Sequence, residues 1–213
     1  EYDSLVLATG AFPALPDIPG CNLDGVFHMT TMEDAAAIAQ RVKGNPGGRA
    51  VIIGGGFIGV EAAEALGINK WDVTMLERES QLFPGMLDFE IASLIQEHLY
   101  EHMIEPEFNA SVIAIEGEGG AVKAVKTAAR SYDADLVIIA AGLRPDTALA
   151  REAVLETGAT GALKVNGAMQ TSDPDIYAGG DCVESIHLVT GKPCYLPLGS
   201  TANKHGRVIA DNI

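Results

Sequence analysis

Apolar runs alternate with segments of helical periodicity along the chain. Runs rich in Val, Ile, Leu and Ala predict strands at residues 2–8, 50–53, 72–77, 111–116, 121–127, 135–140 and 176–178. The glycine-rich segment 117–120 predicts a hairpin between two of them. Segments that suit helices span residues 31–43, 60–66 and 88–103. This alternation of strands and helices favours an α/β fold.

Two of the predicted helices carry a local signal. Residues 31–34 (T-M-E-D) resemble a capping box in which Asp replaces the usual Glu, so we expect a helix to begin there. The helix at 88–103 is predicted to be amphipathic, with one apolar face made of Ile91, Leu94, Ile95 and Leu99.

A glycine-rich turn joins the strand at 50–53 to the helix at 60–66. Residues 54–59 read G-G-G-F-I-G, a G-x-G-x-x-G pattern, and Glu77 ends the next strand about 20 residues further on. Strand, turn, helix, strand and terminal acid therefore occur in the order of a dinucleotide-binding unit. A glycine turn with a purely structural role is the alternative.

Each part of this pattern has a physical role at a dinucleotide. Gly54 permits the tight turn, Gly56 lets the backbone approach a pyrophosphate, and Gly59 lets the helix pack close to the strand. The N–H groups at the start of the helix face the phosphates. We expect Glu77 to accept hydrogen bonds from a ribose diol.

Glu77 also bears on the choice between NAD(H) and NADP(H). Its carboxylate faces the 2′-phosphate of NADP as a like charge, and two unit charges about 4 Å apart repel by about 4 kcal/mol at an effective dielectric constant of about 20. This repulsion favours NAD(H). The adjacent Arg78 can turn toward a phosphate, so NADP(H) is the alternative.

The charge of the chain excludes several classes of partner. Its 213 residues include 14 Lys and Arg against 29 Asp and Glu, a formal net charge of −15. Such a chain cannot neutralise a row of phosphates, which argues against nucleic acid, and it is repelled by an anionic membrane surface. We find no apolar run that could span a bilayer and no signal peptide.

Few residues suggest thiol or metal chemistry. Cys21, Cys182 and Cys194 are widely spaced and form no C-x-x-C motif, which favours reduced, inert thiols in a cytoplasmic protein. For Cys182 a redox role is the alternative, because this residue directly follows a motif described below. His98 and His102 have a spacing that can hold a metal. Because no third ligand is in view, we expect a solvated helix edge and no metal site.

The strand at 135–140 repeats the first strand of the chain. Residues 3–13 (D-x-L-V-L-A-T-G-x-x-P) align without gaps on residues 135–145 (D-x-V-I-I-A-A-G-x-x-P). The match fits two nucleotide domains of common design, and chance is the alternative for so short a segment.

Residues 171–181 carry a second dense signal, T-x-x-x-x-I-Y-A-x-G-D. It resembles the second flavin motif of the pyridine nucleotide–disulfide oxidoreductase superfamily. Residues 7–10 (L-A-T-G) resemble the A-T-G strand end of that superfamily, and residues 140–145 resemble its crossing back into the flavin domain. The glycine fingerprint resembles its NAD domain. Residues 197–204 are most similar to the coenzyme A-disulfide reductase and NADH oxidase branch.

The resemblance implies a fold. It is α/β, with a Rossmann-like three-layer dinucleotide-binding domain that has a small antiparallel β-meander at residues 27–143. Residues 1–26 and 144–213 then form a partial FAD-binding domain.

The resemblance also implies two sets of cofactor contacts. The implied NAD contacts are Gly54, Gly56, Phe57, Ile58, Gly59, Glu61, Glu77, Arg78, Gly142 and Asn203. The implied FAD contacts are Thr9, Gly10, Gly180, Asp181, Thr201 and Ala202. Asp181 would bind the ribityl hydroxyls, and residues 200–203 would start a helix whose positive end faces the flavin. Phe57 and Ile58 would line the nicotinamide pocket, and Glu61 would bind the nicotinamide amide.

The function that the resemblance implies is that of an FAD-dependent enzyme. Hydride from NAD(P)H, with NAD(H) preferred, would pass to FAD and reduce a disulfide such as coenzyme A disulfide. An NADH oxidase or peroxidase of the same family is the nearest alternative, and a non-catalytic NAD-binding redox sensor is another.

Members of the superfamily also have an N-terminal FAD fingerprint, a redox cysteine and a C-terminal dimerisation domain. The sequence contains none of these, so we expect a fragment that has no catalytic residue, binds NADH, holds FAD weakly and turns over nothing alone. The parent is expected to be a homodimer whose other partners are its small nucleotide cofactors.

Overall fold

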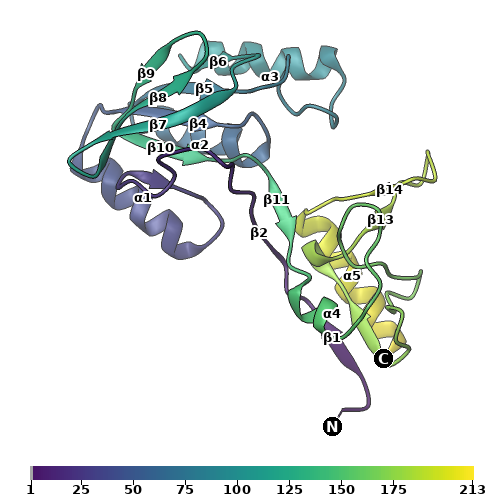
Figure 1. Ribbon diagram of the computed structural model, residues 1–213. Coiled ribbons are helices and arrows are strands. Elements are labelled where there is room, and N and C mark those ends of the chain that lie inside the picture. The colour runs from purple at the N-terminus through teal and green to yellow at the C-terminus, as the bar shows by residue number, and fades with distance from the viewer. Residues whose placement is uncertain (1) are drawn as a thin grey trace. The chain divides into compact units, whose positions relative to one another are not determined.

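The structure is a computed structural model that describes residues 2–213. It divides into two compact units. We call Pro13–Gly142 the central unit, and the segment ending at Phe12 together with Leu143–Ile213 the terminal unit. The chain crosses between them within β2 (Ala11–Pro13) and at the start of β11 (Leu143–Pro145), and these two strands pair (Figure 1).

A parallel five-stranded sheet in the order β3-β10-β4-β5-β6 forms the middle of the central unit. Its strands are β3 (Val26–Phe27), β4 (Arg49–Ile53), β5 (Asp72–Leu76), β6 (Glu105–Glu107) and β10 (Leu136–Ile139). The chain moves outward from β4 through β5 to β6 and then returns to β10 on the other side of β4. The strand order therefore reverses between β4 and β10, which is where open α/β sheets bind ligands beyond the carboxyl ends of their strands.

The sheet lies between a layer of helices and a small antiparallel meander (Figure 1). The helices are α1 (Met32–Gly44), α2 (Phe57–Ile68) and α3 (Phe89–Glu101), and the meander is β7 (Val112–Glu118), β8 (Ala121–Thr127) and β9 (Ser131–Asp133). Ile52 and Ile138 pack with the helices, whereas the alternate residues Val51 and Val137 pack with the meander. Both faces of the sheet are covered, so its central strands are apolar throughout. The predicted three-layer Rossmann-like fold with a meander is confirmed.

The predicted start of α1 is confirmed at the level of its hydrogen bonds. The Thr31 hydroxyl accepts from the Asp34 N–H at 3.1 Å, and the Asp34 carboxylate accepts from the Thr31 N–H at 2.9 Å. Asp therefore replaces the usual Glu of a capping box without losing the reciprocal pair. The Thr30 and Thr31 N–H groups that bond to the Asp34 carboxylate lower its pKa.

The predicted apolar face of α3 is wrong in part. Leu99 is buried and Ile95 packs against the core, but Ile91 and Leu94 are 50% and 61% exposed. The reason is the position of the helix, since α3 contacts the edge strand β6. At an edge, only a narrow strip of the helix meets the core.

The structure places residues 13–26 in the central unit, whereas the sequence motifs put the domain boundary at residues 26/27. Ile18, Cys21 and Leu23 pack in the same cluster as Ile115 and Val122 of the meander. Burial of these apolar side chains holds the proline-rich segment against the central unit.

The terminal unit is built around two parallel strands, β1 (Leu5–Leu7) and β12 (Ile176–Ala178). Its other elements are α4 (Ala148–Glu152), the short 3₁₀ helix η1 (Gly180–Cys182), β13 (Ser185–Ile186), β14 (Pro193–Cys194) and α5 (Gly199–Asn212). Leu7, Leu163 and Ile209 contribute to its core. Parallel strands normally belong to larger sheets that are covered on both faces, so this pair has the character of part of a larger sheet.

The sequence repeat corresponds to a structural repeat. In residues 3–13 and again in residues 135–145, a parallel strand is followed, three residues after its end, by a glycine of positive φ, +73° at Gly10 and +107° at Gly142. In each copy a short second strand follows, and these second strands are β2 and β11, which pair. This arrangement supports the interpretation of a common design.

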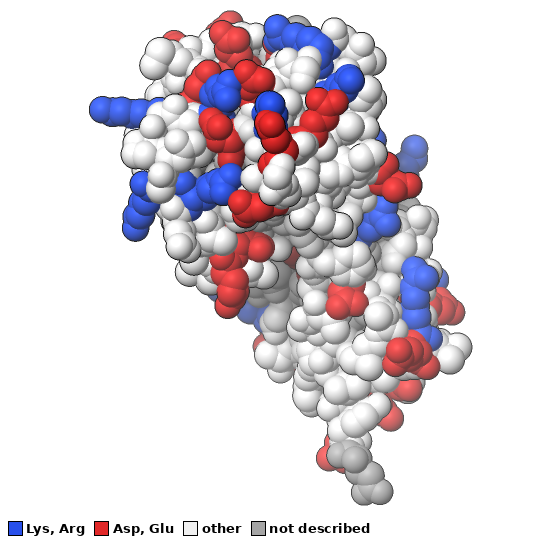
Figure 2. All heavy atoms as spheres, turned by 60° about the vertical axis from the view of Figure 1, so that its left-hand side comes forward, with Lys and Arg blue, Asp and Glu red and all other residues white. Residues whose placement is uncertain are grey.

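Acidic and basic side chains are interspersed over the face of the molecule in Figure 2, which carries no broad basic patch. None of the helices in residues 2–213 has both the length and the apolar character needed to cross a bilayer. In the same part of the chain, no group of three or more His, Cys, Asp or Glu could hold a metal. The His98 and His102 rings lie 4.3 Å apart between centroids without a third such residue to complete a site.

We predict that the helix-facing side of the sheet dominates stability. Ile138→Ala removes a fully buried side chain, so the free energy of unfolding should fall by about 2–5 kcal/mol. Ile91→Ala makes the same substitution at a half-exposed site and should change it by no more than about 0.5 kcal/mol. Urea denaturation of both variants checks this, and equal effects would contradict the observed burial.

Candidate functional site

Two of the three fingerprint glycines are required by backbone contacts. Gly54 has φ +113°, and a Cβ there would overlap the carbonyl oxygen of Ala140 at the end of β10. A Cβ on Gly59 would overlap the carbonyl oxygen of Gly54. The predicted roles of Gly54 in the turn and of Gly59 in close packing are therefore visible in the geometry.

Gly56 differs from the other two glycines. It has φ −89° and ψ −169°, an extended conformation that any residue adopts, and no atom of the protein lies within 4 Å of a Cβ built there. The fold itself gives no reason for a glycine at this position. The open space is what a ligand needs in order to approach the backbone.

The N-terminus of α2 begins at this open glycine. Gly56 is the N-cap residue, and no side chain caps the helix. The first N–H groups of a helix have no acceptor within the helix and carry its partial positive charge, so an uncapped start is suited to bind a phosphate.

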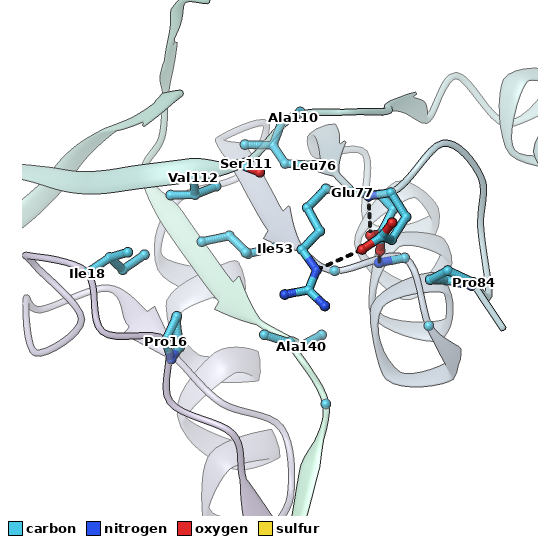
Figure 3. Close-up of a pocket in the computed structure, with 17 residues that line it drawn as sticks. Pro16, Ile18, Ile53, Leu76, Glu77, Pro84, Ala110, Ser111, Val112 and Ala140 are labelled. Atoms are coloured by element: carbon cyan, nitrogen blue, oxygen red, sulfur yellow. Dashed lines mark hydrogen bonds and ion pairs between the residues drawn. The ribbon is translucent and has the colours of Figure 1, made fainter. Parts of the chain in front are cut away.

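Glu77 braces the turn from the neighbouring strand end. Its side chain is buried, one carboxylate oxygen accepts from the Gly55 N–H at 2.7 Å, and the other accepts from the Glu79 N–H at 2.9 Å (Figure 3). A carboxylate offers about four acceptor sites, so these two bonds leave capacity for the predicted ribose diol. The brace itself was not foreseen from the sequence.

Arg78 forms an ion pair with its neighbour Glu79. The Arg78 Nε lies 3.1 Å from Glu79 Oε1, and the Arg78 side chain is 77% exposed. Exposed pairs of this kind contribute little energy, and this one engages only the Nε–H of Arg78, so the guanidinium keeps donors for a phosphate.

These groups line one cleft of about 450 Å³ in the central unit, a size suited to a nucleotide. It is lined by Pro16, Ile18, Ile53, Gly54, Gly55, Gly56, Leu76, Glu77, Arg78, Glu79, Pro84, Ala110, Ser111, Val112, Ala140, Ala141 and Gly142. The cleft lies beyond the carboxyl ends of β4, β5 and β10, at the reversal of strand order. Figure 3 shows Pro16 and Ile18 across the cleft from Glu77 and Pro84.

The apolar wall of this cleft was missed from the sequence. Pro16 and Ile18 come from the segment before β3, and Ala110 to Val112 follow β6. No strand was predicted at β6, so no signal in the sequence indicated that the residues after it gather with those after β5 at the same edge of the sheet.

The structure gathers only some of the predicted NAD residues in this cleft. Phe57, Ile58 and Glu61 lie at the start of α2 outside the lining, with the Phe57 ring 4.8 Å from that of Phe83. Asn203 belongs to α5 of the terminal unit. Their predicted contacts with the cofactor remain predictions.

A second cleft, of about 460 Å³, lies in the terminal unit. It is lined by Val6, Ala8, Gly10, Gly179, Gly180, Asp181, Gly199, Ala202, Gly206 and Ile209. Four residues predicted from the flavin motifs meet there, namely Gly10, Gly180, Asp181 and Ala202.

The other two predicted FAD residues lie outside this lining. The Thr9 hydroxyl donates to the Asp146 carbonyl oxygen at 2.6 Å. Thr201 is partly buried in the first turn of α5. Gly199 and Gly206, which the prediction lacked, add to the small residues that keep the cleft open.

The cysteines have the surroundings expected of structural thiols. Cys182 is fully buried, and its thiol donates to the carbonyl oxygens of Gly179 and Leu7. The Cys21 thiol donates to Ile18, and burial raises its pKa. Lack of solvent access opposes thiolate chemistry at Cys182, so the alternative of a redox role for this residue finds no support.

The fold and its two clefts define a dinucleotide-binding protein of the Rossmann type. The sequence profile of the pyridine nucleotide-disulphide oxidoreductase family matches residues 1–193. The chain belongs to this family.

Named relatives are oxidoreductases. An NADH oxidase of Methanocaldococcus jannaschii is 41% identical over 213 residues, all of this chain and 47% of the relative. A CoA-dependent NAD(P)H sulfur oxidoreductase of Pyrococcus abyssi is 40% identical over the same shares. The solved NAD-dependent persulfide reductase of A. fulgidus has a TM-score of 0.95 and 44% identity, covering 99% of this chain and 39% of that one. The chain thus spans about half the length of the curated relatives it matches.

We predict that the fingerprint glycines differ in their effect on stability. Gly59→Ala forces a methyl group against the Gly54 carbonyl and should lower the free energy of unfolding by about 1–3 kcal/mol. Gly56→Ala enters open space and should change it by less than about 1 kcal/mol. Denaturant titration checks both variants, and a larger loss for Gly56→Ala would refute this account of the turn.

Proposed function

We propose that this chain is the nucleotide-binding part of an FAD-dependent NAD(P)H oxidoreductase. NADH binds in the cleft of the central unit, and FAD binds in the cleft of the terminal unit. The observation that carries the proposal is the convergence of an open glycine, an uncapped helix start and a buried carboxylate at the reversal of strand order. Those three features suit a pyrophosphate and its adjoining ribose.

The central cleft accommodates the parts of NADH in a definite order. The pyrophosphate lies over Gly56 at the start of α2, and the ribose diol donates to Glu77. The adenine lies against the apolar wall that includes Ile18 and Val112. Because the phosphates meet backbone N–H groups, binding of an anion does not require a basic side chain.

Several features of the terminal cleft support the binding of the flavin end of FAD. Gly10 and Gly180 leave open space beside the backbone, where a Cβ would meet no atom within 3.4 Å, and the Asp181 side chain is present as an acceptor for hydroxyls. The start of α5 has no side-chain cap, so its partial positive charge is available to an electron-rich ring edge. When bound there, FAD supplies the redox chemistry by accepting hydride from NADH.

We propose a sulfur–sulfur bond, such as that of coenzyme A disulfide, as the electron acceptor of the whole protein. The sulfur and persulfide reductases among its relatives support this choice. The relative named NADH oxidase supports the alternative acceptor, oxygen or peroxide. NADH consumption by the full-length protein, measured separately with coenzyme A disulfide and with oxygen, distinguishes the two. The flavin-type cleft argues against a sensor that binds NAD alone.

We predict that the chain binds NADH more tightly than NADPH, by about tenfold or more, because Glu77 repels the 2′-phosphate. Glu77→Gln removes the charge and keeps one oxygen for the backbone, so the preference should shrink severalfold. Glu64→Gln, the same change at an exposed site on α2, is the matched control. Isothermal titration with both cofactors measures the ratio. Tighter binding of NADPH by the unmodified chain would refute this role of Glu77.

A second prediction concerns the open space at Gly56. Gly56→Ala should weaken NADH binding by about tenfold or more while leaving the fold intact, because its methyl group occupies the path of the pyrophosphate. Gly44→Ala also enters open space, at the end of α1, and should leave NADH affinity unchanged. NADH fluorescence titration is the measurement. If Gly56→Ala binds NADH with unaltered affinity, the pyrophosphate does not lie over Gly56.

A further inference from the structure

The turn that carries Asp181 is pressed against α5. A Cβ on Gly179 would lie 2.8 Å from the Cδ1 of Ile209 and 3.2 Å from the Cβ of His205, and Gly180 has φ +80°. The backbone of η1 and the side of α5 therefore approach each other more closely than ordinary side chains allow. Any group at this contact influences where the turn lies.

His205 makes a specific bond across this contact. The Gly180 N–H donates to the Nδ1 of His205 at 3.3 Å. Nδ1 accepts only when it carries no proton, so the bond requires the neutral ring with its proton on Nε2. A second proton on the ring would place an N–H at Nδ1, opposite the Gly180 N–H, and the bond would be lost.

The next residue of the turn is held from another direction. The Tyr195 hydroxyl donates to the backbone carbonyl oxygen of Asp181 at 2.9 Å. Two side chains thus fix two consecutive residues of the turn through their backbone groups. Because Asp181 lines the cleft, fixing the backbone of this turn also fixes the position of a cleft residue.

We propose that His205 is a positioning residue that holds Gly180, and through it the Asp181 carboxylate, in the geometry that binds flavin. Protonation of His205 releases the turn and weakens flavin binding. The consequence for FAD rests on the proposed function, whereas the hydrogen bond and its pH dependence belong to the chain itself.

The charges around His205 set the direction of this pH dependence. Besides His205, the ionisable groups on α5 and on the segments bonded to or packed against it are Tyr177, Asp181, Cys182, Tyr195, Lys204, Arg207 and Asp211. Burial lowers the pKa of His205, and the negative charge of Asp181 opposes that shift. Burial and the same Asp181 charge raise the pKa of Tyr195 to about 12, so its hydroxyl keeps its proton near neutral pH.

A histidine whose folded-state pKa lies below its unfolded value is held neutral by the fold. Its contribution to the stability of the fold is complete above the pKa of the unfolded state, about 6.5. That contribution is lost as the pH falls through the lower pKa of the folded state. The turn is therefore ordered at neutral pH and released in acid.

The first test is nuclear magnetic resonance of the chain without flavin. We expect the amide shift of Gly180 to follow the titration of the His205 ring, at a pH below about 6.5. In His205→Gln, whose side-chain oxygen can accept but does not titrate, the Gly180 amide should keep its protection from exchange and show no such transition. In His205→Phe, protection should be lost at every pH. A flat Gly180 shift while His205 titrates, or an unchanged transition in His205→Gln, would overturn the proposal.

The second test is titration of the full-length protein with FAD at about pH 8 and about pH 5.5. Loss of one hydrogen bond should weaken binding by about fivefold at the lower pH. His205→Gln should change by less than about twofold, whereas the control His187→Gln, at an exposed histidine of the terminal unit, should behave as the unmodified chain. The same pH effect in His205→Gln would exclude a role for His205. Absence of FAD binding at both pH values would refute the flavin assignment, and the resonance data alone would then decide whether His205 holds the turn.

Discussion

The close approach of three backbone segments at the end of β4 is the constraint on which the rest depends. Gly54 turns the chain at a positive φ beneath the carbonyl of Ala140, and Gly59 brings α2 onto the carbonyl of Gly54. No residue with a Cβ fits at either contact. As a result, the start of α2 lies at the reversal of strand order, with its N-cap Gly56 in the lining of the cleft.

Glu77 connects this backbone geometry to chemistry. A buried carboxylate normally requires partners, and here two backbone N–H groups supply them, from Gly55 of the turn and from Glu79 of the next loop. One side chain thereby joins the carboxyl ends of two adjacent strands. The proposed binding mode also accounts for an anionic ligand on a chain of net charge −15: local backbone dipoles would attract the phosphates, and the carboxylate would face the neutral diol.

Local patterns in the sequence predicted what depends on neighbouring residues. The capping box at Thr31 and the contact of Gly59 with the Gly54 carbonyl are local, whereas the role of Gly54 and the strand–glycine–strand repeat were predicted because they carry a recognisable sequence motif, although their contacts are distant along the chain. Long-range packing decided the rest. The assignment of Ile18 to the central unit, the exposure of Leu94 and the brace made by Glu77 depend on segments that periodicity does not relate. Most residues of the apolar wall of the cleft could not be predicted from the sequence for the same reason.

The most direct test of the central claim is a crystal structure of this chain with NADH. The account predicts phosphate oxygens within hydrogen-bonding distance of the N–H groups at the start of α2. It also predicts the adenosine ribose diol on the free positions of the Glu77 carboxylate. NADH bound outside the cleft, or bound in it with its phosphates away from Gly56, would contradict the account.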